Sequence, residues 1–369
     1  MTLEATVAAV LFLGVLLYAV LGGADFGSGF WDLTAGDARR GGKVRALIDH
    51  SIGPVWEANH VWLIYVLVFL WTAFPRPFAA IMTTLFVPLA FAALGIVLRG
   101  AGFAFRKFAE TVAEARLYGA FFAVSSVVTP FFLGAVAGAV ASGRVPADGS
   151  GDVWTSWTGP TSLIGGTLAV LTCAFLAATF LAAEAERAGD PDLAESMARR
   201  AFVTGVVTGA VALVAVLVLE TDAETLASGL HGRAAVFVVG SAVAGLRALW
   251  LLRAGRYARA RIGAVLAVAA IVVGWGVAQY PWMLVDEVRI VDGAGARPTL
   301  VALLVVFALA AVTVVPALGY MLWLTQQSEW AATEEIGAED SLDPSAGVVS
   351  GAIDGSAPPV NDSNAPTIG

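Results

Sequence analysis

The stretch TSLIGGTLAVLTCAFLAATFLAA, residues 161–183, decides the fold class because it contains no charged side chain. A helix needs about 20 mostly apolar residues to cross the hydrocarbon of a bilayer. Runs of similar length and polarity recur along the chain, and with this one they make nine. Their limits are 5–24, 54–74, 77–98, 117–141, 161–183, 201–219, 233–251, 262–280 and 299–324. The sequence therefore predicts an all-α polytopic membrane protein, a bundle of about nine transmembrane helices.

Composition supports a membrane protein over the soluble classes. The 369 residues are 58% hydrophobic and 14% charged, whereas a soluble domain is about half apolar and about a quarter charged. The single cysteine, Cys173, excludes an internal disulfide framework. The chain is therefore not a typical soluble protein, a disordered chain or a disulfide scaffold.

The acidic charge is concentrated at the C-terminal end. Residues 329–369 carry eight acidic side chains and no Lys or Arg, which leaves 21 acidic and 21 basic residues in 1–328. This segment is also rich in Gly, Ser, Pro and Asn, a composition typical of a disordered, solvated tail. We expect a transmembrane domain over 1–328 and an acidic tail over 329–369. Nothing in this pattern attracts nucleic acid.

The basic residues predict the orientation of the bundle. Numbered in order, the odd loops between the apolar runs hold 15 Lys and Arg residues, and the even loops hold at most five. Cytoplasmic loops carry the excess of basic residues in membrane proteins. We therefore expect the N-terminus outside the cell and the acidic C-terminal tail in the cytoplasm of a prokaryote, with the chain in the plasma membrane.

Few ionisable side chains lie within or beside the runs, and each is a functional candidate because a charge in hydrocarbon is costly. Asp25 ends the first run in LGGADFGSGFWD, and Glu57 opens the second in IGPVWEANHVWLI. Arg99 and Arg106 close the third in LRGAGFAFR. All four are predicted at the cytoplasmic side. Two readings stay open at this point: the carboxylates take up protons, or they pair with arginines to hold loops in place.

His60 follows Glu57 as E-x-x-H, a spacing that di-iron bundles use in two copies together with two further glutamates. One copy predicts no metal site, and we interpret His60 as a hydrogen-bonded or packing residue. The chain has three histidines, none of which pairs with another at matching depth, so a bis-histidine haem is not expected, whereas a His/Met haem stays open. Residues 103–116 place apolar side chains on one helical face, which predicts a short helix lying on the membrane surface.

Together these motifs resemble subunit II of cytochrome bd-type quinol oxidases. The resemblance runs through residues 1–328 and is densest over the first 110 residues. The motifs that carry it are GGADFGSGFWDL at 22–33, IGPVWEANHVWLI at 52–64, FP at 74–75, LRGAGFAFR at 98–106 and QYPW at 279–282. The string W-[D/E]-x-N-x-V-W-L-I is specific, and Trp56, Glu57 and Asn59 supply its first positions. In many relatives Asp stands at position 57, and His60 is often Gln or Glu.

The resemblance implies a partner and a reaction. Family members pair with a larger subunit I that holds two b-type haems and, in many members, a d-type haem. The complex oxidises quinol and reduces dioxygen to water with protons from the cytoplasm. Subunit II carries no haem, stabilises its partner and contributes carboxylates to the proton path, and in some members it holds a structural quinone. The implied proton carriers here are Asp25 and Glu57, with structural or tuning roles for Trp56, Asn59, His60, Arg99 and Arg106.

Two alternatives remain. A proton-coupled transporter or channel would also use a few membrane carboxylates, although no internal repeat and no polar stripe through the middle runs supports one. A pure assembly subunit would share every feature except a kinetic role for Asp25 and Glu57.

Overall fold

The computed structural model describes residues 2–36, 38–52, 56–106, 108–109 and 111–325. Side chains at 38–40, 52, 56–58, 112, 318, 321–322 and 325 also lie outside the description. The chain divides into two units, 1–309 and 310–369. The predicted tail, 329–369, lies outside the described residues, so its separation from 1–328 stays a prediction.

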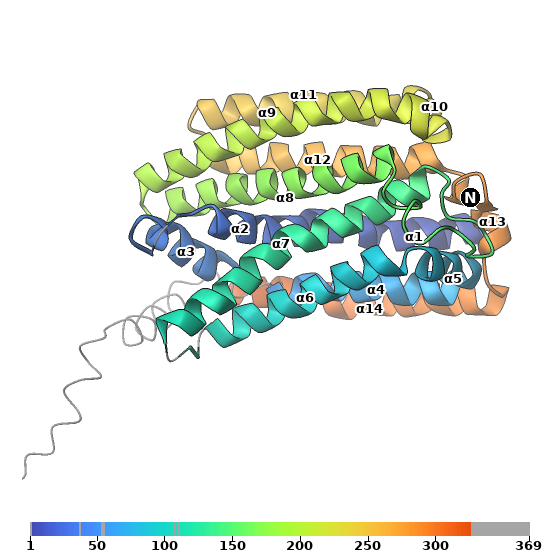
Figure 1. Ribbon diagram of the computed structural model, residues 1–369, viewed down its shortest axis with the longest axis horizontal. Coiled ribbons are helices and arrows are strands. Elements are labelled where there is room, and N and C mark those ends of the chain that lie inside the picture. The colour runs from blue at the N-terminus through green and yellow to red at the C-terminus, as the bar shows by residue number, and fades with distance from the viewer. Residues whose placement is uncertain (1, 37, 53–55, 107, 110, 326–369) are drawn as a thin grey trace, which may run out of the picture. The chain divides into compact units, whose positions relative to one another are not determined.

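The described chain is almost entirely helical (Figure 1). Its elements are α1 (Leu3–Leu17), η1 (Tyr18–Gly22), α2 (Gly23–Leu33), α3 (Ala38–Ile52), α4 (Trp56–Ala73), α5 (Pro75–Thr84), α6 (Phe86–Arg106), α7 (Val112–Ala141), α8 (Pro160–Arg187), α9 (Pro191–Asp222), α10 (Glu224–His231), α11 (Ala235–Arg253), α12 (Tyr257–Gln279), β1 (Trp282–Leu284), β2 (Val288–Arg289), α13 (Ile290–Gly293) and α14 (Arg297–Thr325). In the described residues, eight helices are long and apolar enough to cross a membrane, and the bent pair of α4 and α5 makes a ninth.

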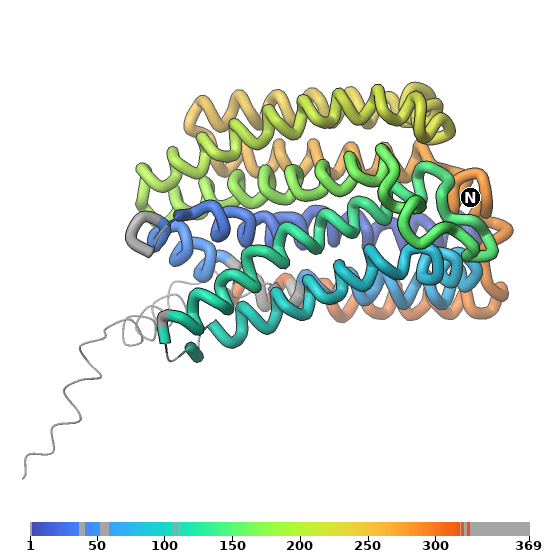
Figure 2. The backbone as a smooth tube through the Cα atoms, in the orientation of Figure 1, coloured from blue at the N-terminus to red at the C-terminus, as the bar shows by residue number. Residues whose placement is uncertain are grey.

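The first span is longer than the sequence predicts. The apolar run ends at residue 24, but α1, the π-helical turn η1 and α2 form one apolar segment from Leu3 to Leu33. Figure 2 shows the chain passing from α1 into α2 without a turn. Asp25 therefore lies inside the first span and not at its end. The local hydropathy does not predict this extension, because α2 contains polar residues that only the neighbouring helices bury.

The predicted third span, 77–98, is wrong in its first part. Residues 75–84 belong to α5, which is bent by 118° from α4, and the straight helix that follows begins at Phe86. The bend lies at Phe74, whose φ of −134° and ψ of 65° are not helical. A residue before proline is disfavoured in the helical region, and Pro75 then starts α5.

Residues 103–116 do not form the predicted surface helix. α6 continues to Arg106, and α7 begins at Val112. Thr111 caps α7 by accepting from the Glu114 backbone N–H, while the Glu114 carboxylate accepts from the Thr111 backbone. This capping box starts a new helix inside the predicted one.

The core of residues 1–309 is centred on α8, which packs against α2, α7, α9 and α12. Small residues allow the close approach: a Cβ on Gly27 of α2 would lie 1.8 Å from the Cys173 carbonyl oxygen of α8. The Trp31 indole N–H donates to the Ala174 carbonyl across the same interface, at 2.8 Å. α2 is therefore fixed in rotation and depth by α8.

Figure 1 places α3 and the α6–α7 and α8–α9 turns at the end of the bundle opposite the N-terminus. These segments belong to the predicted odd loops, where the basic residues gather. The grouping agrees with the charge pattern, while the side of the membrane on which this end lies stays a prediction.

Candidate functional site

A buried ion pair joins α2 to α6 inside the bundle. Arg99 Nη2 lies 2.6 Å from Asp25 Oδ1 and donates to the Asp25 backbone carbonyl at 2.9 Å. Both side chains are at most 2% exposed. The other guanidinium nitrogen, Nη1, donates to Ser126 Oγ of α7. The sequence motif LRGAGFAFR thus supplies the partner of Asp25, from a helix 74 residues away.

Aromatic rings cover the guanidinium of Arg99. Its Cζ lies 4.3 Å from the centroid of the Phe122 ring and 5.0 Å from that of Phe26. Such faces attract a cation more strongly where water is excluded. Gly29 leaves the room this arrangement needs, because a Cβ there would lie 2.9 Å from Arg99 Nη1. A charged residue is thereby held within an apolar bundle.

Not every polar atom of this cluster has a hydrogen-bond partner among the described residues. Asp25 Oδ2 is buried and accepts none, Arg99 Nε donates none, and the Tyr18 hydroxyl is also without one. Buried polar atoms usually find a protein or water partner. Asp25 Oδ2 therefore keeps an acceptor capacity that no described residue fills.

His60 and Asn59 of α4 lie beside this cluster. The His60 ring packs against Phe26, with centroids 5.9 Å apart, and against Tyr18 at 6.5 Å. Asn59 is buried. Among the described residues no group of three His, Cys, Asp or Glu side chains is placed to hold a metal ion. Trp56 and Glu57 form the first turn of α4, but their side chains lie outside the described residues.

A second ion cluster lies two helical turns away, and its central residue, Asp32, is not among the candidates predicted from the sequence. Asp32 Oδ1 is 2.7 Å from Arg45 Nε of α3, and Asp32 Oδ2 is 3.0 Å from Arg106 Nη1 of α6. Arg106 therefore pairs with Asp32 and is not in contact with Asp25. The sequence does contain a pattern that indicates Asp32. Asp25 and Asp32 are seven residues apart, as are Arg99 and Arg106, so the two acids share one helix face and the two arginines share another.

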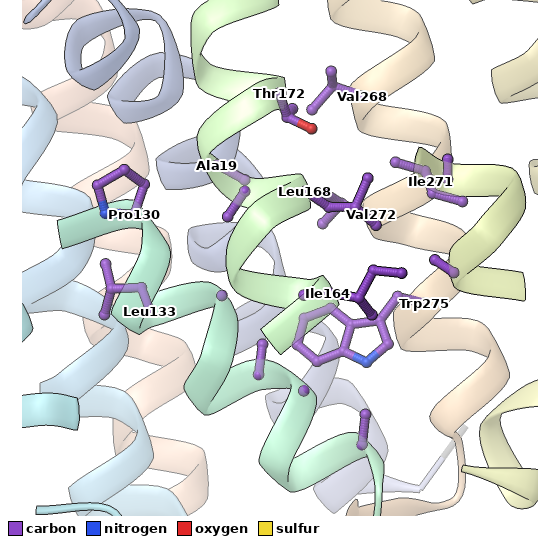
Figure 3. Close-up of a pocket in the computed structure, with 18 of the residues that line it drawn as sticks. Ala19, Pro130, Leu133, Ile164, Leu168, Thr172, Val268, Ile271, Val272 and Trp275 are labelled. Atoms are coloured by element: carbon purple, nitrogen blue, oxygen red, sulfur yellow. The ribbon is translucent and has the colours of Figure 1, made fainter. Parts of the chain in front are cut away.

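An apolar cavity of about 410 Å³ lies next to the Asp25 cluster. Figure 3 shows Ile164 and Leu168 of α8 near Val272 and Trp275 of α12 within it. Tyr18 and Phe26 line the cavity and also border the ion pair. The cavity suits an apolar molecule, because the residues that line it are almost all apolar.

Comparisons with known proteins agree on one family. The model for "Cytochrome bd terminal oxidase subunit II" matches residues 3–325. A putative cytochrome bd menaquinol oxidase subunit II of Bacillus subtilis is 24% identical over 315 residues, 82% of this chain and 89% of that protein. Cytochrome bd-I ubiquinol oxidase subunit 2 of Escherichia coli K12 is 30% identical over 135 residues, 36% of this chain and 35% of that protein.

A solved structure of the bd oxidase from Geobacillus thermodenitrificans contains a chain with the same fold. The TM-score is 0.75 at 25% sequence identity, and the match covers 88% of this chain and 99% of that one.

Proposed function

Because this chain belongs to the cytochrome bd terminal oxidase subunit II family, we propose that it stabilises a haem-bearing subunit I and conducts cytoplasmic protons toward the reduction of dioxygen to water. The chain is a multi-pass membrane protein and a subunit of a respiratory terminal oxidase. In the proposal the partner holds b-type haem and haem d and oxidises quinol, while this chain carries no redox centre.

The observation that supports the proton role is the buried Asp25 carboxylate. One of its oxygens is ion-paired, and the other accepts no hydrogen bond from the described residues. Oδ1 is held by Arg99, while Oδ2 has no hydrogen-bond partner in the described residues. A relay group must hold and release a proton within hydrogen-bond reach of the next group, directly or through one water. The Arg99 contact fixes the carboxylate so that Oδ2 is the atom that exchanges.

Glu57 is the second proposed carrier. The first turn of α4 places it three residues before His60, which packs beside Phe26 and Tyr18 at the Asp25 cluster. In the predicted orientation this turn lies on the cytoplasmic side. Protons would pass from Glu57 to Asp25 through water and then to groups of the partner subunit.

The cavity supports a structural quinone as part of the proposal. Its walls are apolar, which suits an isoprenoid tail. A quinone held there would fill the space between α7, α8 and α12 and stabilise their packing. No proton step depends on it.

An assembly role without proton conduction is the second candidate. It is favoured by the ion pair itself, since Asp25 and Arg99 join α2 to α6 whether or not a proton moves. In this case Asp25 and Glu57 would affect stability and not kinetics. A proton-coupled transporter finds no support in the family membership.

The experiment that separates these roles is Glu57→Gln in the intact complex. Gln keeps the size and polarity of the side chain but cannot carry the proton. We expect quinol-driven oxygen consumption per haem, and proton uptake from the cytoplasmic side, to fall about tenfold or more while haem content stays normal. Normal turnover and charge movement would overturn the proton path and leave the assembly role.

A further inference from the structure

Three ion pairs join the short helix α3 to its surroundings, and each lies along its length. Lys43 Nζ is 2.8 Å from Asp190 Oδ2 in the α8–α9 turn. Arg45 reaches Asp32 of α2, and Asp49 Oδ2 is 3.8 Å from Arg106 Nη2 of α6. The apolar face of α3 is also buried, with Val44, Leu47 and Ile48 in the core beside Trp31. α3 is therefore fixed to α2, to α6 and to the α8–α9 turn.

Asp32 forms ion pairs with two of the arginines around α3. Its side chain is 4% exposed, and its two oxygens are divided between Arg45 from α3 and Arg106 from α6. Arg45 also donates from Nη2 to the Gly36 carbonyl at 2.7 Å, which fixes the connection between α2 and α3. Among the described residues, the charged groups in contact with Asp32 are these two arginines, and Asp49 faces Arg106. Removing Asp32 would therefore break the ion pair that joins α3 to α2 and would leave Arg106, the partner of Asp49 in α3, without its second carboxylate.

The position of α3 matters because the chain passes from it directly into the start of α4. Three residues, 53–55, separate the last residue of α3 from Trp56, and Glu57 follows. Because this connection is short, the position of α3 restricts where the first turn of α4 can begin. Asp32 itself is seven residues from Asp25, about 10 Å along the helix axis, too far for a direct hydrogen bond.

We propose that Asp32 is a positioning residue for proton uptake: through Arg45 and Arg106 it fixes α3, and α3 in turn fixes the first turn of α4 that carries Glu57. This inference rests on the proposed proton path and adds to it a residue that carries no proton. Both oxygens of Asp32 are held by guanidinium groups, so its function is geometric. A displaced donor slows transfer steeply because relay groups must stay within hydrogen-bond reach.

The test compares Asp32→Asn with Arg45→Gln in the intact complex. Both substitutions remove the ion pair between Asp32 and Arg45. Asp32→Asn makes the local charge more positive by one unit, and Arg45→Gln makes it more negative by one unit. Turnover per haem is measured from pH 5 to 10, with haem content as the check on assembly. The positioning role predicts that both variants lose about threefold to tenfold in turnover and shift the pH profile in the same direction. Asp32→Glu should restore most of the rate.

The matched control is Asp222→Asn at the other end of the bundle. Asp222 also pairs with an arginine, Arg144, and accepts from Thr161 Oγ1 at 2.6 Å. This variant should lower complex stability without moving the pH profile. Because Arg45 is partly exposed, Arg45→Gln remains measurable if Asp32→Asn does not assemble.

Two results would overturn the inference. Opposite shifts of the pH profile in Asp32→Asn and Arg45→Gln would show a purely electrostatic effect, and an unchanged profile with reduced haem content would show a purely structural one. Glu57→Gln, measured in the same series, separates the two proposals. If it slows turnover while Asp32→Asn does not, the proton path stands and the positioning role fails; if it does not slow turnover, both fail.

Discussion

Arg99 shows at the scale of one residue how this bundle accommodates a charge. Its side chain is 1% exposed and combines an ion pair with Asp25, a hydrogen bond to Ser126 and two aromatic faces. A buried ion pair contributes little net stability, but removing one partner leaves an uncompensated charge. Loss of either partner is therefore expected to destabilise the fold much more than the intact pair stabilises it.

Arg99→Gln should destabilise the chain by about 3–5 kcal/mol, because it leaves the Asp25 carboxylate buried without its cation. The double variant Asp25→Asn with Arg99→Gln should recover a large part of this loss, since no unpaired charge remains. Thermal unfolding of the detergent-purified complex measures both. A double variant whose loss equals the sum of the two single losses would contradict this account of the pair.

Asp25, Arg99 and Asp32 show what could be predicted from the sequence at this scale and what could not. The motifs singled out Asp25 and Arg99, and the structure brings them into contact. Asp32 was missed because it lies eight residues beyond the predicted end of the first apolar run, where the sequence predicts an exposed loop. Its burial depends on α3 folding back across it, which no local pattern reports.

At the scale of the element, the approach of α2 to α8 depends on the absence of side chains. Gly27 faces the Cys173 carbonyl, and the contact also aligns Trp31 with the Ala174 carbonyl. Periodicity predicts both helices but not which faces meet. The bend between α4 and α5 illustrates the same limit: FP at 74–75 was noticed as a motif, but the apolar run continued through it.

Gly27→Ala should separate α2 from α8, because its Cβ would lie 1.8 Å from a backbone oxygen that cannot move alone. We expect a loss of about 2 kcal/mol or more, in the range of overpacked cores, together with weaker haem retention in the complex. Gly209→Ala in α9 is the control, since nothing lies within 4 Å of its added Cβ. Equal stability of the two variants would show that the α2–α8 contact is not tight.

At the scale of the whole molecule, the charge pattern and the fold agree on which loops share an end of the bundle. Nine apolar runs were predicted, and the described residues contain eight spanning candidates plus the bent pair. The number of runs follows from hydropathy alone. The orientation rests on 15 basic residues against at most five, a bias that sets topology but leaves no trace in the packing.

Cysteine labelling in intact cells tests the orientation. The native thiol, Cys173, is buried, so background reaction with a membrane-impermeant maleimide should be low. Ser150→Cys, in the α7–α8 connection, should react from outside the cell. Ala188→Cys, in the α8–α9 turn, should react only after the membrane is opened. The reverse pattern would contradict the predicted topology.

The central claim is that this chain functions as the partner of a haem-bearing subunit. The most direct measurement is a reduced-minus-oxidised optical spectrum of the tagged chain, purified in mild detergent from its native membrane. We expect b-type haem bands together with a larger co-purifying subunit, and a band further to the red if haem d is present. A stable, colourless chain that purifies without a partner would contradict this claim.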